Sequence, residues 1–236
     1  VGENKKLTFE LPIPTHKEAI ELVLRILTND ETKVINSIKE IQAIGHRVVH
    51  GGEFFKESTI VTKDVIEKIE QLIPLAPLHN PANIMGIKIC QELMPNIPNV
   101  TVFDTAFHQT MTKENFLYAV PYADYTEHHL RKYGFHGTSH YYVSNETVKI
   151  LNKKDSKIIV CHLGNGSSVC AVRDGKSIST SMGLTPLEGL IMGTRCGDID
   201  AGVIPYLMEK KNLTSNQILD YLNKKSGILG ISGISS

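Results

Sequence analysis

Side chains that can bind anions or move protons are concentrated in short segments of this 236-residue chain that also hold glycine or proline. Glycine lets a backbone approach a ligand closely, and a turn between strands that exposes several N–H groups can cradle a phosphate. His162–Ser168 has this form, with a Gly-Asn-Gly turn between two predicted strands. A plain type I′ hairpin turn is the alternative interpretation. The six segments are Gly45–Gly52, Ala76–Pro81, Phe103–Gln109, Tyr133–His140, His162–Ser168 and Met192–Asp200.

Two arginines stand out because the basic residues of the chain are mostly lysine. Arg47 and Arg195 both lie in glycine-rich segments, whereas Arg25 lies on the solvated face of a predicted helix. A planar guanidinium binds carboxylate or phosphate oxygens through two parallel hydrogen bonds, which lysine cannot do. For each of the two, an anion site and a structural salt bridge are both open interpretations.

Asp104 directly follows an apolar strand predicted at residues 99–103. The carboxyl ends of strands are where α/β sheets present their reactive groups. An acid in this place can orient a nucleophile or hold a metal-bound water, and capping of a following helix is the alternative.

Histidines fall in the same segments. His136 and His140 lie four residues apart, a spacing that can suit a metal, but no HExxH pattern or cysteine pair accompanies them. His136 is better suited to donating a hydrogen bond to developing negative charge, and His140 is predicted to be structural. His79 precedes a predicted helix, where it either caps that helix or supports the site.

The four cysteines, at positions 90, 161, 170 and 196, form no C-x-x-C pair. This usage predicts a reduced, cytosolic protein rather than a disulfide framework or a zinc site. Cys196 adjoins Arg195, but packing is the favoured interpretation because no base or partner thiol is evident in the sequence.

Predicted strands and helices alternate in each half of the chain, which indicates an α/β fold with two lobes. The segment 105–123 lacks clear periodicity and is predicted to carry the chain between them, and 226–236 is predicted to be a loop. Strands are predicted at 7–11, 43–50, 99–103, 157–163, 167–173 and 176–180. Helices are predicted after capping boxes at Thr15 and Thr185, and at 63–73, 80–93, 138–151, 202–210 and 215–224.

Several classes of function are excluded by composition and motif. The formal net charge is zero, which gives no electrostatic footprint for nucleic acid, and no apolar run reaches membrane-spanning length. The chain contains no Walker A motif, no G-x-S-x-G elbow and no protein-kinase motif. A site rich in anion-binding groups and poor in nucleophiles fits phosphoryl transfer, where an enzyme mostly positions groups and neutralises charge.

Taken together, the segments GHRVVHGG, APLHNP, FDTAFHQTM, GFHGTSH, HLGNGSS and MGTRCGDID resemble the acetate kinase family, in order and over essentially the whole chain. That family belongs to the acetate and sugar kinase, heat-shock ATPase and actin superfamily. The resemblance implies a two-lobed, actin-like (ribonuclease-H-like) α/β fold, with residues 1–105 in the first lobe and 106–236 in the second. It also implies Mg²⁺-dependent transfer of phosphate from ATP to acetate, with propionate or butyrate as the alternative acceptors.

The resemblance implies a role for each matched residue. Arg47 and Arg195 would bind the carboxylate and the transferring phosphoryl group, and Asp104 would be the catalytic carboxylate. His136 and Arg195 would stabilise the transition state, and His79 would support the site. The substrate methyl would lie among Val49, Leu78, Phe135 and Pro186, and the ATP phosphates would lie on His162, Leu163, Gly164, Asn165 and Gly166.

Relative to the family pattern, the fold is expected to be incomplete at both termini. The N-terminal strand with its Asn-x-Gly-Ser-Ser-Ser turn and the C-terminal adenosine loop have no counterpart in the chain. The Mg²⁺ ligands are expected in those parts, so no metal ligand is assigned here, and the chain alone is expected to have little or no kinase activity. The resemblance also implies a cytoplasmic homodimer formed through the second lobe, with no nucleic-acid or membrane partner.

Overall fold

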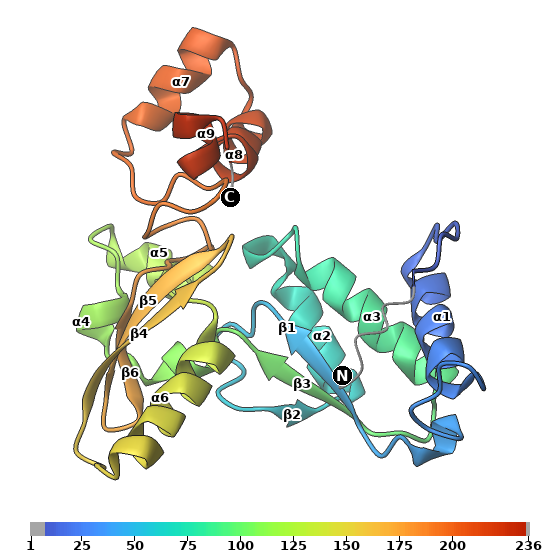
Figure 1. The fold of residues 1–236 in the computed structure, drawn as a ribbon. Coiled ribbons are helices and arrows are strands. Elements are labelled where there is room, and N and C mark those ends of the chain that lie inside the picture. Colours follow the sequence, from blue (N-terminus) through green and yellow to red (C-terminus); the bar gives the residue numbers. More distant parts are fainter. Residues whose placement is uncertain (1–7, 235–236) are drawn as a thin grey trace.

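The computed structural model describes residues 8–234 of the chain (Figure 1). Residues 8–14 form no regular element, so the strand predicted at 7–11 is wrong for residues 8–11, and residue 7 lies outside the described part. Helix α1 (His16–Thr28) begins at Thr15, whose side chain accepts a hydrogen bond from the Lys17 N–H at 3.2 Å. The predicted cap is confirmed, but Glu18 bonds the hydroxyl of Thr15 and not its backbone.

The first sheet has the strand order β1 (Ile44–Val48), β3 (Asn99–Phe103), β2 (Thr59–Ile60), with β1 and β3 parallel. A short 3₁₀ turn, η1 (Ile38–Glu40), precedes it. Between β2 and β3 the chain forms α2 (Lys63–Gln71), the 3₁₀ turn η2 (Ile73–Leu75) and α3 (Asn80–Leu93). This crossover makes β1 and β3 parallel neighbours, so both strands end at the same edge of the sheet.

One apolar core joins this sheet to its helices. Val48 of β1 and Phe103 of β3 are almost fully buried, and they pack with Ile69 of α2 and Ile87 of α3. Figure 1 shows α2 and α3 beside the sheet, with α1 beyond α3. The rigid packing of β1 and β3 fixes the positions of the residues that follow them.

Residues 105–136 connect this part to a second sheet. They contain η3 (Ala106–Thr110), α4 (Lys113–Phe116) and α5 (Tyr122–His128). The first two lie in the segment 105–123 that lacked periodicity, and α5 begins at its end. A buried ion pair ties this connection to the β1–β2 loop, since Arg131 is 3% exposed and donates to Glu53 at 2.6 Å. The Arg131 guanidinium also lies 3.6 Å from the centroid of the Phe116 ring.

The second sheet is an antiparallel meander that follows helix α6 (Gly137–Leu151). Its strands β4 (Lys157–Leu163), β5 (Ser167–Arg173) and β6 (Lys176–Thr180) have the predicted bounds. Positive φ at Asp174 (51°) and Gly175 (76°) closes the β5–β6 turn, as a two-residue type I′ hairpin requires. Helix α6 packs against β4, and its first residues face the end of the first sheet.

The C-terminal part holds α7 (Val203–Lys211), α8 (Ser215–Lys224) and α9 (Gly227–Ser232), which stand above the second sheet in Figure 1. The helix predicted to start at Thr185 is absent from residues 181–202, which contain only turns and bends. Glu188, the expected capping partner, instead bonds the side chains of Lys132 and Tyr118. The loop predicted at 226–236 is wrong over α9, and residues 235–236 lie outside the described part.

Within residues 8–234, no helix is both long enough and apolar enough to cross a membrane.

Candidate active site

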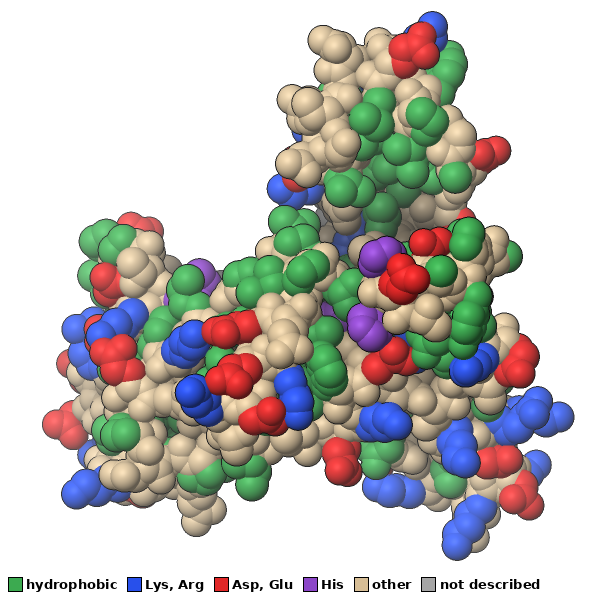
Figure 2. Space-filling view, turned by 180° about the vertical axis from the view of Figure 1, so that it is seen from behind, with side chains coloured by type: hydrophobic (Ala, Val, Ile, Leu, Met, Phe, Trp, Pro, Cys, Tyr) green, Lys and Arg blue, Asp and Glu red, His purple; other side chains and the backbone are tan. Residues whose placement is uncertain are grey.

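The predicted anion-binding residues meet in one cavity of about 590 Å³. They come from the ends of β1 and β3, the start of α6, the β4–β5 turn and the 181–202 segment. In Figure 2 histidine side chains are visible near the base of the part that holds the C-terminal helices. The lining residues are Arg47, Asp104, His136, Thr138, Ser139, Tyr142, His162, Gly164, Asn165, Gly166 and Arg195.

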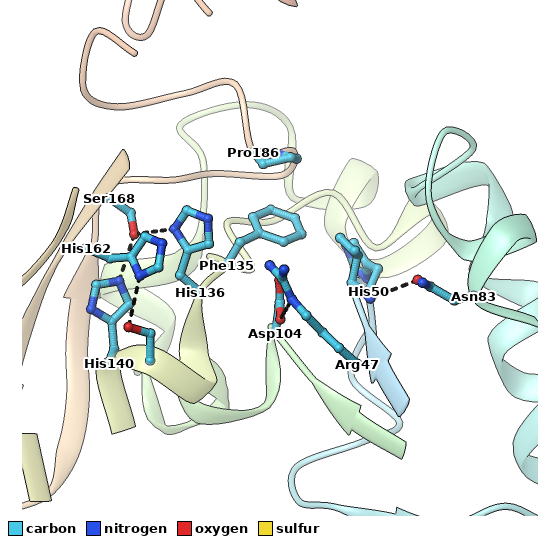
Figure 3. A network of polar contacts seen from close by, with 12 residues as sticks. Arg47, His50, Asn83, Asp104, Phe135, His136, His140, His162, Ser168 and Pro186 are labelled. Carbon is cyan, nitrogen blue, oxygen red and sulfur yellow. Dashed lines mark hydrogen bonds and ion pairs between the residues drawn. The ribbon is translucent and has the colours of Figure 1, made fainter. Parts of the chain in front are cut away.

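Arg47 and Asp104 form a bidentate ion pair, drawn in Figure 3. Arg47 donates from Nε to Oδ1 at 2.9 Å and from its terminal nitrogen to Oδ2 at 2.7 Å. The Asp104 side chain is 3% exposed and the Arg47 side chain 67% exposed, so the pair presents its guanidinium to the cavity. The hydrogen bonds to Asp104 raise the pKa of Arg47. The ion pair predicted as one alternative for Arg47 is therefore present. Asp104 does not cap a helix, because among the described residues its carboxylate accepts only from Arg47 and the N-cap of the following η3 is Thr105.

His136 reaches this pair because Gly137 lets α6 begin against the end of β3. The Gly137 N–H donates to the Asp104 carbonyl at 2.8 Å, and a Cβ on Gly137 would lie 2.3 Å from that oxygen. His136 has φ of 58° at the N-cap of α6, and its ring stacks on His162 with centroids 4.1 Å apart. Burial and the neighbouring His162 lower the pKa of His136 to about 4, so the ring is neutral at pH 7.

The β4–β5 turn is not the plain type I′ hairpin that the sequence left open. Leu163 pairs with Ser167, which leaves three residues in the turn, and none of these has positive φ. The Asn165 carbonyl accepts from the Gly193 N–H at 3.1 Å, which ties the turn to the segment that carries Arg195. Leu163 is 72% exposed and is not among the residues that line the cavity, so its predicted place on the phosphate loop stays a prediction.

Arg195 lines this cavity and bonds a residue on the lining of a second one. Its guanidinium donates to the Pro186 carbonyl at 3.0 Å, and among residues 8–234 no carboxylate pairs with it. A Cβ on Gly166 would lie 3.3 Å from the same guanidinium and 3.5 Å from Cε1 of His136. The side chain is therefore held in the cavity with most of its donors available for an anion.

Helices α8 and α9 fix the backbone around Arg195. The Cys196 N–H donates to the Leu222 carbonyl at 3.0 Å, and the Ser226 N–H donates to the Thr194 carbonyl at 3.0 Å. Gly227 has φ of 63°, and a Cβ there would lie 2.2 Å from the Met192 carbonyl. Burial raises the pKa of the Cys196 thiol, which agrees with packing rather than reactivity.

The predicted acyl-binding residues line the second cavity, also about 590 Å³. Phe135 is 2% exposed and packs with Met182 and Met192, with Val49 against them. His79 occupies the N-cap position of α3 without a side-chain capping bond, so helix capping by its ring is excluded. Burial, and next the nearby Arg195, lower the pKa of His79. The predicted residues on this lining are Val49, Leu78, His79, Phe135 and Pro186.

Two asparagines that sequence reasoning treated only as part of a helix start hold the backbone beyond β1. Asn83 accepts from the Val49 N–H at 3.1 Å, as Figure 3 shows beside His50. Asn80 exchanges two hydrogen bonds with the backbone of His50, at 3.3 and 3.1 Å. Asparagine is a poor helix former. Its repetition at the start of a predicted helix, in Asn80-Pro-Ala-Asn83, was therefore the sequence signal that these side chains have another role.

The described residues fit a phosphate better than a metal. The space beside Gly166, which a Cβ would fill, lies between the donors of Arg195 and the ring of His136. Mg²⁺ needs six oxygen ligands in near-octahedral geometry, and no group of three or more His, Cys, Asp or Glu side chains in the described part of the chain could hold a metal. Asp104, the acidic side chain that lines this cavity, is engaged by Arg47.

The fold and the two cavities define a two-lobed α/β protein with a cavity lined by two arginines. The chain belongs to the Acetokinase family, which matches residues 1–236. It is 57% identical over 234 residues to acetate kinase of Caldanaerobacter subterraneus subsp. tengcongensis, covering 98% of this chain and 58% of that protein. The chain thus spans less than two thirds of the relatives it matches.

Solved structures agree with this membership. Porphyromonas gingivalis acetate kinase superposes with a TM-score of 0.92 at 48% identity, over 98% of this chain and 59% of that one. A propionate kinase from Francisella tularensis subsp. tularensis SCHU S4 superposes with a TM-score of 0.89 at 50% identity, over 94% and 56%. The predicted actin-like α/β fold class is confirmed by these neighbours.

Proposed function

We propose that the protein containing this chain is an acetate kinase, which transfers phosphate reversibly from ATP to acetate and yields acetyl phosphate and ADP. The observation that carries the proposal is the position of Arg195. Its guanidinium lines the anion cavity and bonds the carbonyl of Pro186, which lines the apolar cavity. A carboxylate whose methyl lies in the apolar cavity would meet a phosphoryl group at this boundary.

Charge neutralisation and positioning account for the chemistry. Acetate is ionised at pH 7, so it needs no base, and Asp104 acts by holding Arg47 in place. The transferring phosphoryl group carries charge on its equatorial oxygens, and fixed donors from Arg47, Arg195 and His136 would stabilise it. Gly164, Asn165 and Gly166 would face the ATP phosphates.

Use of ATP and Mg²⁺ belongs to the same proposal. The family resemblance and the anion cavity support ATP as phosphoryl donor. Mg²⁺ would neutralise phosphate charge when bound, and residues outside those described here would supply ligands for it.

The acceptor is tested by comparing kcat/KM for acetate, propionate and butyrate in the full-length protein. We expect acetate to be preferred, because Val49 and Phe135 narrow the buried end of the apolar cavity. One methylene is worth about 1–3 kcal/mol of discrimination, so propionate should be a poorer substrate, by roughly ten-fold or more, and not an excluded one. A preference for propionate would make the protein a propionate kinase, as in the Francisella neighbour. Absence of acyl phosphate with any of the acids would remove the enzymatic proposal altogether.

We also propose a homodimer formed through the second lobe, residues 106–236, in the cytoplasm. Exposed apolar side chains support the interface, because α7, α8 and α9 carry Tyr206, Leu219, Ile228 and Ile231 with more than a third of their surface open. Figure 2 shows hydrophobic side chains gathered over this part of the molecule. Four free cysteines agree with a reducing compartment. Light scattering of the full-length protein should give twice the monomer mass, and a monomer at micromolar concentration would refute the dimer.

A further inference from the structure

His140 and Ser168 have no place in the proposed mechanism, yet they form a buried chain of hydrogen bonds that ends on His136. Ser168 lies on β5 and is fully buried. Its hydroxyl oxygen is 2.9 Å from Nδ1 of His136 and 2.7 Å from Nε2 of His140. Figure 3 shows the serine between the two rings, with His162 beside them.

The direction of each bond follows from counting protons. The Ser168 hydroxyl has one hydrogen and two lone pairs, and among the described residues its oxygen lies within hydrogen-bond distance of these two ring nitrogens alone. If both rings donated to it, its own hydrogen would be buried without an acceptor, so Ser168 donates to one imidazole and accepts an N–H from the other. Both rings are neutral at pH 7, because burial lowers the pKa of His140 to about 3 and that of His136 to about 4. Each ring therefore carries a single proton, on one nitrogen or the other.

His140 decides between the two arrangements. Its Nδ1 is buried and has no hydrogen-bond partner among the described residues. If the proton of His140 were on Nδ1, that N–H would be buried and unpaired, which is rare in folded proteins. With the proton on Nε2, the N–H donates to Ser168, and only a lone pair is left without a partner.

The rest of the chain of bonds is then fixed. Ser168 accepts from His140 and turns its own hydrogen toward Nδ1 of His136. His136 must then carry its proton on Nε2. In the imidazole ring, Cε1 lies between this nitrogen and the Nδ1 that accepts from Ser168. Cε1 lies 3.5 Å from the place that a Cβ on Gly166 would fill, so this edge of the ring faces the anion cavity.

We propose that His140 and Ser168 are positioning residues that lock His136 in the tautomer with its proton on Nε2, so that a neutral imidazole presents an N–H to the phosphoryl group. The opposite tautomer would present a lone pair to anionic oxygens and repel them. The part of this proposal that concerns catalysis rests on the proposed kinase function, whereas the tautomer itself does not. His140 was predicted from the sequence to be structural, and in this proposal it also positions His136.

The tautomer is read directly by long-range ¹H–¹⁵N correlation on the full-length protein labelled in histidine, with His136→Gln used to assign the signals. We expect a protonated Nε2 and a bare Nδ1 for His136 at pH 7, without any substrate. A protonated Nδ1 in the unmodified protein would overturn the proposal. This measurement does not need kinase activity, so it tests the tautomer even if the proposed function is wrong.

The second arm uses Ser168→Ala, the smallest change that removes the hydroxyl. We expect the signals of His136 to shift toward a mixture of tautomers, and kcat to fall about ten-fold while KM for acetate and ATP stays within about two-fold. Ser144→Ala is the matched control, because Ser144 is about equally buried on α6 and its hydroxyl bonds, within the described part of the chain, the Tyr141 carbonyl alone. Unchanged His136 signals and unchanged kcat in Ser168→Ala would contradict the locking role.

Discussion

Replacing Arg195 by alanine is expected to lower kcat for acetyl phosphate formation by about 10³-fold. The guanidinium lies 3.3 Å from the Cβ position of Gly166 and bonds Pro186, so it stands between the proposed phosphate and acyl sites. Its charge is not neutralised by any carboxylate in the described part of the chain. Steady-state kinetics on the full-length protein, with acetate and ATP varied separately, measure the loss.

Two matched variants test whether the loss comes from the guanidinium of Arg195 in particular. Arg195→Lys keeps the charge but loses the planar guanidinium, so its kcat should still be about 10- to 100-fold below that of the unmodified protein. Arg25→Ala removes an exposed arginine from α1 and should leave kcat within about two-fold. If Arg195→Ala changed KM for ATP alone and left kcat intact, Arg195 would be a binding residue without a role in the transition state.

Acid is expected to destabilise the fold steeply, because three fully buried histidines are neutral in the native state. Burial lowers the pKa of His50 and His108 to about 4 and that of His140 to about 3. The unfolded chain binds protons at these side chains below its pKa of about 6.5, whereas the native state does not until pH 4 or lower. The stabilisation is therefore complete above pH 6.5 and is lost as the pH falls from 6.5 toward 4.

The expected size follows from the number of protons. Each proton bound only by the unfolded state contributes about 1.4 kcal/mol per pH unit, so three give roughly 4 kcal/mol per unit near pH 5. Urea unfolding of the full-length protein at a series of pH values measures this slope. His108→Gln should reduce the slope by about one proton, and His128→Gln, at an exposed position, should not change it. A stability that stays flat between pH 7 and 5 would show that these rings take up protons in the native state as readily as in the unfolded chain.

Local patterns were sufficient for many of the regular elements. The strands at 99–103, 157–163, 167–173 and 176–180 have the bounds that their apolar alternation and flanking turns predicted. Helix α3 begins at Asn80 and ends at Leu93 as expected. Such elements depend on side chains that are near in sequence, so short windows carry the information.

Predictions failed where distant partners compete for a local signal. Thr185-Pro186 followed by Glu188 has the pattern of a helix start, but Lys132 and Tyr118 bond the carboxylate of Glu188 and no helix forms. Residues 227–232 are rich in glycine, yet they form α9 because its first turn bonds the Met192 and Gly193 carbonyls. In both places a tertiary contact outweighs a weak local preference.

The sequence by itself determined the α/β order of elements and placed arginine, aspartate and histidine in short segments rich in glycine or proline, a setting that suits anion binding. Only the tertiary structure decided which of these side chains are already paired. Arg47 is engaged by Asp104, 57 residues away, whereas the partners of Arg195 among residues 8–234 are a backbone carbonyl and a methionine sulfur. The tertiary structure also joins His136 to His140 through Ser168. Hydrogen bonds have a reach of about 3 Å, so such partners are fixed only when the two sheets and α6 have packed together.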